Sequence, residues 1–375
     1  MNNKEISYKI DGVVNKVIIN KKIEKALLKD LISIKSDKKI LFIYDENIDK
    51  KFIGNIIDQI KLSGGNIETQ KVKGTKNNKS LKNLLFLFDI LLKKNFSKKS
   101  VVISCGGGVI GDLCSLLSSL YLRGTLYFHI PSTMTAIVDS CIGGKTGINY
   151  KNVINSFGNY HHPNRVYISE EILKTLPARE YRSGISEILK YGLLGNKKIL
   201  SLLQSKKDFI INRDFKYLSI LISESLKTKI SFFLKDIKEN KKRLYLNFGH
   251  TFAHAIEMAT DKLVKKDFFR HGEAVGIGML CEILLSNHQK PENNIELMEV
   301  TKKILQIYDL PIKINLHSNI SKSKIQNEIY KNIFLDKKRI NKNPRYICLK
   351  KIGNPQIKEI ENLHLINEVI YNFIN

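Results

Sequence analysis

The stretch VVISCGGGVIGDLCSLLSSLYLRGTLYFHIPSTMTAIVDSCIGGKTGIN, residues 101–149, decides the fold class. Its apolar start, Val101–Cys105, predicts a buried strand that runs into a glycine cluster. Gly106, Gly108 and Gly111 match G-x-G-x-x-G at the start of an expected helix, where backbone N–H groups and the positive helix end can bind phosphate. The same glycines also suit a tightly packed turn, so the motif alone does not choose between the two interpretations.

The residues after the glycines differ from an ordinary dehydrogenase motif. That motif has an acidic residue about 20 positions later for the ribose hydroxyls, whereas here the position is occupied by Arg123 and its neighbours. Further on, Ser132 and Thr133 follow a second apolar run, and Asp139 precedes a glycine turn that carries Lys145. Hydroxyls, an acid and a lysine suit a phosphate-bearing ligand, although Asp139 alone would more often be a cap or turn residue.

Composition limits the classes of protein to consider. A length of 375 residues predicts two domains rather than one, and 43% hydrophobic residues suffice for packed cores. Lysines on solvated surfaces are the simplest explanation of the formal net charge of +26, with an anionic small substrate or nucleic acid as alternatives. The basic residues are spread along the chain, and no zinc-finger spacing or RNA-binding signature occurs. We therefore expect no nucleic-acid partner.

Cysteine usage and targeting signals favour the cytoplasm. The five cysteines form no C-x-x-C pair, and an odd, dispersed set is typical of a reducing compartment. Residues 1–12 lack the apolar core of a signal peptide. The most apolar run, Leu84–Leu92, is short and contains Asp89, so we expect no membrane-spanning segment.

Strand and helix patterns alternate up to about residue 168, which predicts a parallel α/β layer. Residues 1–35 would supply one or two strands and a helix. The elements expected next are strands at Ile40–Tyr44 and Asn66–Val72 and helices at 50–62 and 81–94. Asp45 and Asn47 follow the first of these strands, where an acid can hold ribose hydroxyls but is more often a helix cap.

The pattern changes beyond residue 170. Helical periodicity dominates from 178 to 310, and one further strand is expected at Tyr346–Leu349. We therefore predict an α/β domain at residues 1–170 and a mainly α-helical domain at residues 171–375.

Three separated segments of the helical part carry polar groups. Glu187 and Lys190 lie on one helix face, and a surface ion pair is the simplest explanation of that spacing. A second group follows at helical spacing and consists of His250, His254 and Glu257, and the third is His271 with Glu273. Any single histidine is more often structural than a ligand. Two histidines and one glutamate from three segments would nevertheless form an open zinc site with a position left for substrate.

These motifs closely resemble those of the 3-dehydroquinate synthase family. The family patterns GGGVIGD, YLRG, VDS-x-x-GGKT, SE-x-x-KYG, LN-x-GHTF-x-HAIE and HGEAV-x-IGM occur here in the family's order. The similarity spans residues 40–350 and is densest over 101–280. The resemblance implies an NAD-binding α/β domain, a helical domain that binds one divalent metal ion (zinc or cobalt), and a homodimer.

The resemblance also implies the reaction. Members of the family convert 3-deoxy-D-arabino-heptulosonate 7-phosphate to 3-dehydroquinate and phosphate, a step of the shikimate pathway. NAD oxidises a ring hydroxyl transiently, phosphate is eliminated, the hydride returns, the ring opens and an intramolecular aldol reaction closes the carbocycle. Other sugar-phosphate cyclases, a metal-dependent polyol dehydrogenase and a binding protein without activity remain as alternatives.

The resemblance assigns roles residue by residue. It makes Glu187, His250 and His271 the metal ligands, whereas periodicity alone would pair His250 with His254, which the family instead places near the leaving phosphate. Asp139 would lie between nicotinamide and substrate. The phosphate would be held by Arg123 (reaching across the dimer interface), Lys145, Asn155 and Lys337 or Lys338. The carboxylate and hydroxyl end would be held by Lys190, Lys229, Arg243 and Asn247. The cofactor would contact Asp45, Asn47, Gly107, Gly108, Val109, Asp112, Ser132, Thr133, Asp139, Lys145 and Thr175.

Two segments depart from the family pattern, and both concern the cofactor. The family's G-E-x-x-K segment is here Gly74–Lys79, which lacks the glutamate and has one extra residue. In an ungapped alignment from Lys145 to Pro163, Ile154 occupies the position of a family lysine. A gapped alignment would use Lys151 and Asn152 instead. We expect Lys76, Lys79 or Lys151 to compensate in part by reaching the pyrophosphate. NAD should therefore still bind, but more weakly than is usual for the family and with a steeper dependence on salt.

Overall fold

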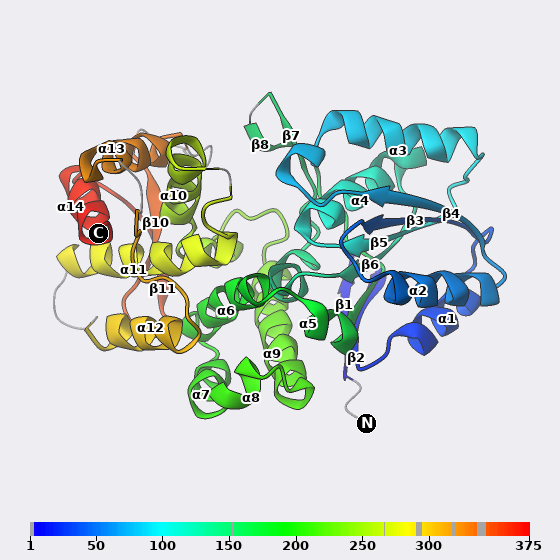
Figure 1. Ribbon diagram of the computed structural model, residues 1–375, viewed down its shortest axis with the longest axis horizontal. Helices are drawn as coiled ribbons and strands as arrows, with labels where there is room; N and C mark the ends of the chain where they lie inside the picture. Colours follow the sequence, from blue (N-terminus) through cyan, green and yellow to red (C-terminus); the bar gives the residue numbers. More distant parts are fainter. Residues whose placement is uncertain (1–3, 152, 266, 290–294, 317–319, 336–342) are drawn as a thin grey trace. The chain divides into compact units, whose positions relative to one another are not determined.

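The chain forms two compact units in the computed structural model (Figure 1), which describes residues 4–375 except 152, 266, 290–294, 317–319 and 336–342. The first unit comprises residues 1–177 together with 213–230, and the second comprises 178–212 together with 231–375. Helix α9 (Phe215–Phe233) begins in the first unit and ends in the second. The boundary expected at residue 170 stays a prediction and falls at the start of α5 (Glu170–Thr175).

The first unit is built on a seven-stranded sheet with the order β1-β2-β9-β6-β5-β3-β4. Its strands are β1 (Lys4–Ile10), β2 (Val13–Asn20), β3 (Lys39–Asp45), β4 (Asn66–Val72), β5 (Val101–Gly106), β6 (Leu126–Pro131) and β9 (Arg165–Ser169). Strands β1 and β2 form an antiparallel hairpin, and every other neighbouring pair is parallel. The parallel α/β layer expected from the sequence is confirmed.

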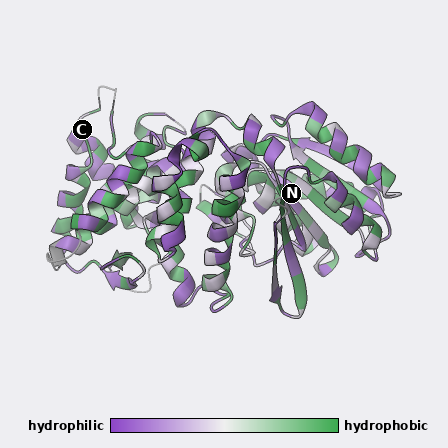
Figure 2. Ribbon diagram, turned by 90° about the horizontal axis from the view of Figure 1, so that it is seen from below, coloured by the Kyte–Doolittle hydropathy of each residue, from purple (hydrophilic) through white to green (hydrophobic). Residues whose placement is uncertain are grey.

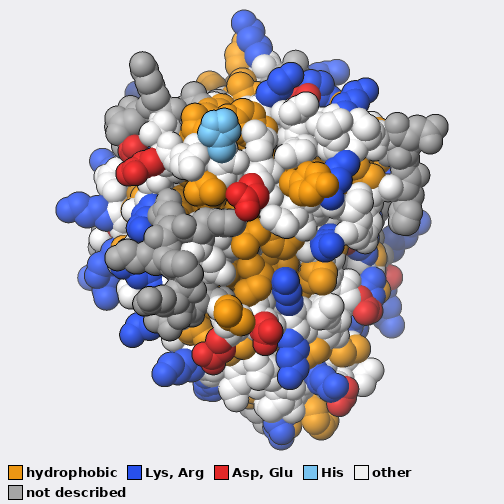
Figure 3. All heavy atoms as spheres, turned by 90° about the vertical axis from the view of Figure 1, so that its left-hand side faces the viewer, with side chains coloured by type: hydrophobic (Ala, Val, Ile, Leu, Met, Phe, Trp, Pro, Cys, Tyr) orange, Lys and Arg blue, Asp and Glu red, His pale blue; other side chains and the backbone are white. Residues whose placement is uncertain are grey.

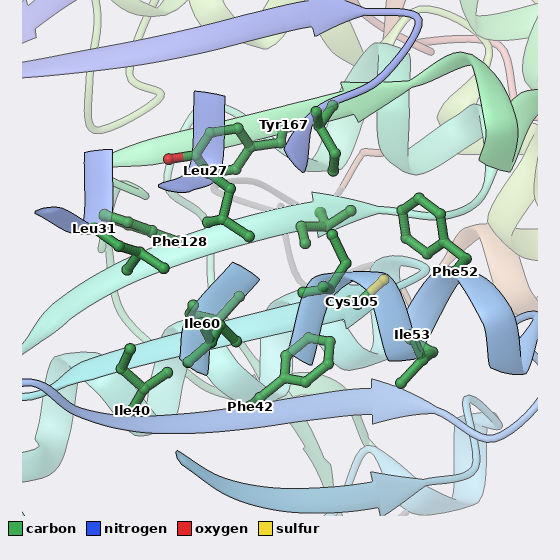
Figure 4. Packing of buried hydrophobic residues seen from close by; sticks show 14 of the residues in the cluster. Leu27, Leu31, Ile40, Phe42, Phe52, Ile53, Ile60, Cys105, Phe128 and Tyr167 are labelled. Carbon is green, nitrogen blue, oxygen red and sulfur yellow. The ribbon is translucent and has the colours of Figure 1, made fainter. Parts of the chain in front are cut away.

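Helices cover both faces of this sheet, as an all-parallel core requires. Helices α1 (Glu24–Ser33) and α2 (Lys50–Leu62) pack on one face, and α3 (Leu81–Lys93) and α4 (Gly108–Leu120) pack on the other. Figure 4 shows side chains from α1 and α2, including Leu27 and Ile60, against Phe42 and Phe128 of the strands. All six residues of β5 are buried, so the glycine cluster leaves the centre of the sheet at a fixed point.

Shorter elements follow the carboxyl end of β6, namely the π-helical turn η3 (Ala136–Ser140) and then the hairpin of β7 (Ile148–Tyr150) and β8 (Val153–Phe157). The single turn η2 (Tyr121–Arg123) instead joins the end of α4 to the start of β6. Because ligands of open parallel sheets bind outside these strand ends, the elements here are the ones that can position a cofactor.

The second unit is mainly helical. It contains α6 (Ala178–Leu193), α7 (Lys197–Ser205), α8 (Lys207–Ile211), η4 (Lys242–Asn247), α10 (His250–Leu263), α11 (His271–Gln289), α12 (Ile295–Ile307), α13 (Lys322–Ile333) and α14 (His364–Asn372). A hairpin of β10 (Arg345–Leu349) and β11 (Pro355–Glu359) completes it. The strand expected at Tyr346–Leu349 is confirmed. Its partner β11 was not expected, because the sequence PQIKE has no run of apolar or β-branched residues.

The surface helices are amphipathic, and Figure 2 shows hydrophobic and hydrophilic residues on different faces of them. On the face shown in Figure 3, lysine and arginine side chains are distributed over several places rather than gathered in one patch. None of the helices in the described part of the chain combines the length and the apolar character that a membrane crossing needs.

Candidate active site

Three helices of the second unit bring Glu187, His250 and His271 together. Glu187 lies in α6, His250 is the first residue of α10, and His271 is the first residue of α11. The Nε2 atoms of His250 and His271 lie 3.6 and 3.4 Å from the Oε1 atom of Glu187, and one potential ligand atom from each residue lies within 4.8 Å of the others. Two imidazoles and one carboxylate at this spacing suit a divalent metal with an open position.

Glycines allow these three helices to approach so closely. A Cβ atom on Gly272, next to His271, would lie 1.7 Å from the carbonyl oxygen of Ser183 in α6. A Cβ atom on Gly278 would lie 2.0 Å from the carbonyl oxygen of Gly249, which precedes His250 and has a φ of 82°. Larger residues would separate the backbones and move the ligands apart, so these glycines position the cluster.

Lys190 contacts the same carboxylate from one turn further along α6. Its Nζ atom lies 2.5 Å from Oε2 of Glu187, and the two side chains are 1% and 0% exposed. The sequence-based explanation of this pair as a surface contact is therefore wrong, because helical spacing carries no information about burial. A buried charge needs a partner, so Lys190 balances Glu187 on the side away from the histidines.

His271 lies between two carboxylates. Its Nδ1 atom is 3.1 Å from Oε2 of Glu257, and its Nε2 atom faces Glu187. Burial acts to lower the pKa of His271, but the charge of Glu257 and the hydrogen bond to Glu187 outweigh it and raise the pKa to about 10. A field that stabilises a proton this strongly also favours a divalent cation, so the residues present fit a metal ion.

His254 lies beside the cluster, with its ring 5.6 Å from that of His250 and 6.0 Å from that of His271. A second possible ligand set, His254, Glu257 and His271, overlaps the first. The set that contains Glu187 is the more deeply buried of the two. Neither of these two sets contains both His250 and His254, the pair that periodicity favoured.

Arg243 and Asn247 lie in η4 of the same unit, just before His250. Arg243 is buried, donates from Nη1 to the carbonyl oxygen of Ile237 and stacks near the ring of Phe233. Asn247 donates from Nδ2 to Oε1 of Glu239 at 2.9 Å. Both side chains are held by their neighbours, which is what orienting a substrate requires.

In the first unit, the structure brings together Asp139 and Lys229, two residues that were predicted separately to lie at the substrate. Lys229 in α9 donates from Nζ to the carbonyl oxygen of Asp139 at 2.7 Å and to its Oδ1 at 2.8 Å. Asp139 lies in the π-helical turn η3, a conformation found often at functional sites. Two residues that are 90 positions apart in the chain are thereby joined.

Lys79 connects two further predicted residues. Its Nζ atom contacts Oδ2 of Asp112, a predicted cofactor contact, and Oδ1 of Asn155, a predicted phosphate contact, both at 2.5 Å. Burial raises the pKa of Asp112, and the charge of Lys79 opposes that rise. Sequence reasoning gave Lys79 only a possible compensating role. The signal was its place at the end of the altered Gly74–Lys79 segment.

Ile154, the other departure from the family pattern, is 58% exposed, and Asn155 next to it adopts a φ of 50°.

The glycine cluster serves packing at several of its positions. A Cβ atom on Gly106 would lie 2.5 Å from Cβ of Ile110, and one on Gly111 would lie 3.1 Å from the ring of His129. Gly107 caps α4, Gly108 is its first residue, and these two remain the candidates for backbone contact with the cofactor, with Val109 next to them. The two interpretations of the motif therefore apply to different glycines.

The remaining predicted cofactor contacts lie after the strands of the same sheet. Asp45 accepts from the backbone and side-chain N–H groups of Asn47, and a Cβ atom on Gly74 would collide with the Asp45 carboxylate. Thr133 caps the next turn by accepting from the backbone of Ala136, and Ser132 precedes it. Thr175 borders a pocket of about 160 Å³, which is lined by Ile48, Asp49, Lys51, Phe52, Asn55, Glu171, Ile172 and Thr175.

Two predicted phosphate contacts lie on the surface of the first unit. Lys145 is exposed on its glycine turn. Arg123 is exposed and has a φ of 62°, and the preceding Leu122 has a φ of 47°. Two consecutive left-handed residues of this kind are costly and occur mainly where function requires them. Lys337 and Lys338 lie outside the described residues.

Comparison with known proteins identifies relatives of this chain. Residues 69–183 match the family model of the 3-dehydroquinate synthase N-terminal domain, and residues 184–339 match that of the C-terminal domain. A curated 3-dehydroquinate synthase from Prochlorococcus marinus (strain MIT 9312) is 35% identical over 336 residues, which is 88% of each chain.

Two solved structures share the fold over almost the whole chain. One is a 2-deoxy-scyllo-inosose synthase complexed with carbaglucose-6-phosphate, NAD+ and Co2+, with a TM-score of 0.85, 21% identity, and coverage of 99% of this chain and 100% of that one. The other is the 2-epi-5-epi-valiolone synthase of Streptomyces hygroscopicus subsp. jinggangensis 5008 with NAD+ and Zn2+, with a TM-score of 0.82, 21% identity and 98% coverage of both chains.

Proposed function

The chain belongs to the 3-dehydroquinate synthase family, and from this membership we infer its reaction. It converts 3-deoxy-D-arabino-heptulosonate 7-phosphate to 3-dehydroquinate and phosphate, with NAD and one divalent metal ion as cofactors. The observation that carries this conclusion is the convergence of Glu187, His250 and His271 in a chain that matches both domains of the family. The alternative cyclases and dehydrogenases are not favoured.

The two cofactors would supply the parts of the chemistry that side chains cannot. When bound, NAD accepts and returns a hydride, and the metal ion acts as a Lewis acid on the substrate oxygens. Glu187, His250 and His271 would hold the metal. Lys190, which pairs with Oε2 of Glu187, would orient that carboxylate.

The substrate would be oriented by cations and amides at its two ends. Arg243 and Asn247, already fixed by Ile237 and Glu239, would hold the carboxylate and hydroxyl end. Lys229, which contacts Oδ1 of Asp139, would assist them. Arg123, Lys145, Asn155 and His254 would surround the phosphate, with one lysine of the 337–338 pair. Several cations around one phosphate favour its release as a stabilised anion.

We further propose a homodimer in which Arg123 reaches the phosphate site of the partner subunit. The exposure of Arg123 and the strained backbone at Leu122 and Arg123 support this, because such strain is found mainly at functional sites. Apolar side chains are exposed on the same unit, namely Leu120, Leu122, Tyr150, Ile154, Phe157 and Tyr160. We also propose a cytoplasmic location, which agrees with five cysteines that are all free.

Incubation of the protein with the heptulosonate phosphate, catalytic NAD and zinc tests the reaction. Phosphate release and the carbocyclic product, followed together by NMR, are the expected result. Turnover of a hexose phosphate in preference to the heptulosonate would show that the chain is a different sugar-phosphate cyclase.

A further inference from the structure

Glu257 contacts His271, one of the predicted metal ligands. It lies in α10, two turns after His250, and its sequence spacing places it on the same helix face as His250 and His254. In the structure its Oε2 atom lies 3.1 Å from Nδ1 of His271, while Nε2 of that ring lies 3.4 Å from Glu187. Glu257 therefore contacts a predicted ligand on the side away from the predicted metal position.

This contact determines which nitrogen of His271 carries the proton. An ionised carboxylate only accepts hydrogen bonds, so Nδ1 of His271 must donate. In the neutral imidazole the lone pair then lies on Nε2, which is the nitrogen that faces Glu187. The side chain of Glu257 is 14% exposed, so water competes little for this contact.

His250 is held in the same tautomer by a different kind of acceptor. Its Nδ1 atom lies 3.1 Å from the carbonyl oxygen of Phe248, and its Nε2 atom also faces Oε1 of Glu187. A backbone carbonyl likewise accepts only. Both rings therefore direct Nε2 at one carboxylate oxygen, and at His271 this orientation depends on a side chain that can be replaced.

We propose that Glu257 is a positioning residue, which fixes the tautomer and orientation of His271 so that Nε2 binds the metal held with Glu187 and His250. The proposal rests on the metal set of the proposed function. In this role Glu257 contacts Nδ1 of His271 and does not bind the metal itself. Such carboxylate–histidine contacts typically change metal affinity by about 10- to 100-fold when removed.

The test is the affinity of the purified protein for Zn2+ and Co2+, measured by competition with a chromogenic chelator. Glu257→Gln keeps the shape of the side chain but removes its charge, and we expect metal binding about 10- to 100-fold weaker. Glu257→Asp keeps the charge on a shorter side chain, and the metal affinity of this variant should lie between those of the wild type and Glu257→Gln. Glu328→Gln is the matched control, because that glutamate of the same unit pairs with Lys262 at 2.7 Å rather than with a histidine. Its affinity should equal that of the wild type.

The visible spectrum of the Co2+ form separates a positioning role from direct ligation. With saturating Co2+, Glu257→Gln should give the wild-type spectrum, because the ligands are unchanged. A changed spectrum would mean that Glu257 is itself a ligand, through the set with His254, and would overturn the proposal. Affinity within about twofold of the wild type would overturn it too. Wild-type protein that binds no metal would instead contradict the proposed function.

Discussion

The metal cluster of the second unit and the cofactor edge of the first unit are built in opposite ways. Glu187, His250 and His271 lie on three helices whose backbones touch at Gly272 and Gly278. The cofactor edge instead consists of turns and a short hairpin, where Lys79 joins Asp112 to Asn155. The family motifs are intact in the metal cluster and altered at the cofactor edge. Helix packing allows little change in the ligands, whereas loops can exchange one contact for another.

The largest effect is expected from the metal ligands. Chelation should abolish turnover, and His271→Ala should lose both metal and activity. The Lewis-acid contribution amounts to several kcal/mol, which corresponds to a rate loss of about 10³-fold or more. Elemental analysis and turnover measured on the same preparation check this. Full activity in metal-free protein would contradict it and would remove the distinction between the two regions.

The altered cofactor edge should show in the affinity for NAD. The glutamate of the family's G-E-x-x-K segment is missing, and Ile154 occupies the position of a lysine. Loss of one hydrogen bond to a charged group costs roughly 1.5–3 kcal/mol, so NAD should bind about 10- to 100-fold more weakly than is usual for the family. Binding should also fall steeply with salt, because Lys76, Lys79 or Lys151 would attract the pyrophosphate mainly through long-range charge attraction, which salt screens.

Calorimetric titration of NAD at low and high salt measures both effects, and Ile154→Lys provides the reverse test. That variant should tighten binding, and the gain should be largest at low salt. Tight binding by the wild type at both salt concentrations would mean that other residues have rebuilt the adenosine side of the site.

Assembly should produce a smaller but diagnostic effect. Arg123→Ala and Lys190→Ala chains should each be inactive as homodimers. After subunit exchange, half of the dimers would be mixed, and each mixed dimer would contain one site with neither lesion. Activity should therefore recover to roughly a quarter of the wild-type value in a symmetric dimer. If heterodimers form, as native mass spectrometry would reveal, and no activity returns, Arg123 acts within its own subunit.

The smallest effect concerns stability within the helical unit. Glu282 of α11 is fully buried and accepts from the backbone N–H of Ile347. Burial raises its pKa to about 8, although backbone hydrogen bonds from Gly249, Ile347 and Thr251 act to lower it. Between about pH 4.5 and 8 the folded state therefore holds a proton that the unfolded state releases, so this residue contributes a loss of stability as pH rises through that window.

Glu282→Gln removes that titration. The difference in melting temperature between variant and wild type should move in favour of the variant by a few degrees from pH 5 to pH 8. Parallel melting curves across this range, read by circular dichroism, would indicate that Glu282 is ionised in the folded protein.

Local pattern predicted most of the fold but not the environment of each side chain. Periodicity predicted the α2 helix at 50–62 and the β4 strand at 66–72 with the observed bounds. The helical spacing of Glu187 and Lys190 could not show whether the pair is exposed or buried. Its burial depends on the helices that pack around α6, which local pattern does not reveal. The contact of Lys79 with Asp112 and Asn155 was likewise beyond reach, since it joins three segments through tertiary structure.

The site was predicted through resemblance more than through physical pattern. Spacing grouped His250, His254 and Glu257, and the structure shows why the family's set differs: Glu187 and His271 come from other helices. Glu257 belongs to the same helix face, but only the position of the His271 ring reveals what it contacts. The variants described above test the roles that we propose for these residues.

The central claim is that oxidation by NAD is transient, and the number of phosphate ions released per NAD tests it most directly. With NAD far below the substrate concentration and zinc present, many phosphates should be released per NAD without growth of NADH absorbance. Stoichiometric accumulation of NADH with no phosphate release would contradict the account and would identify a metal-dependent polyol dehydrogenase instead.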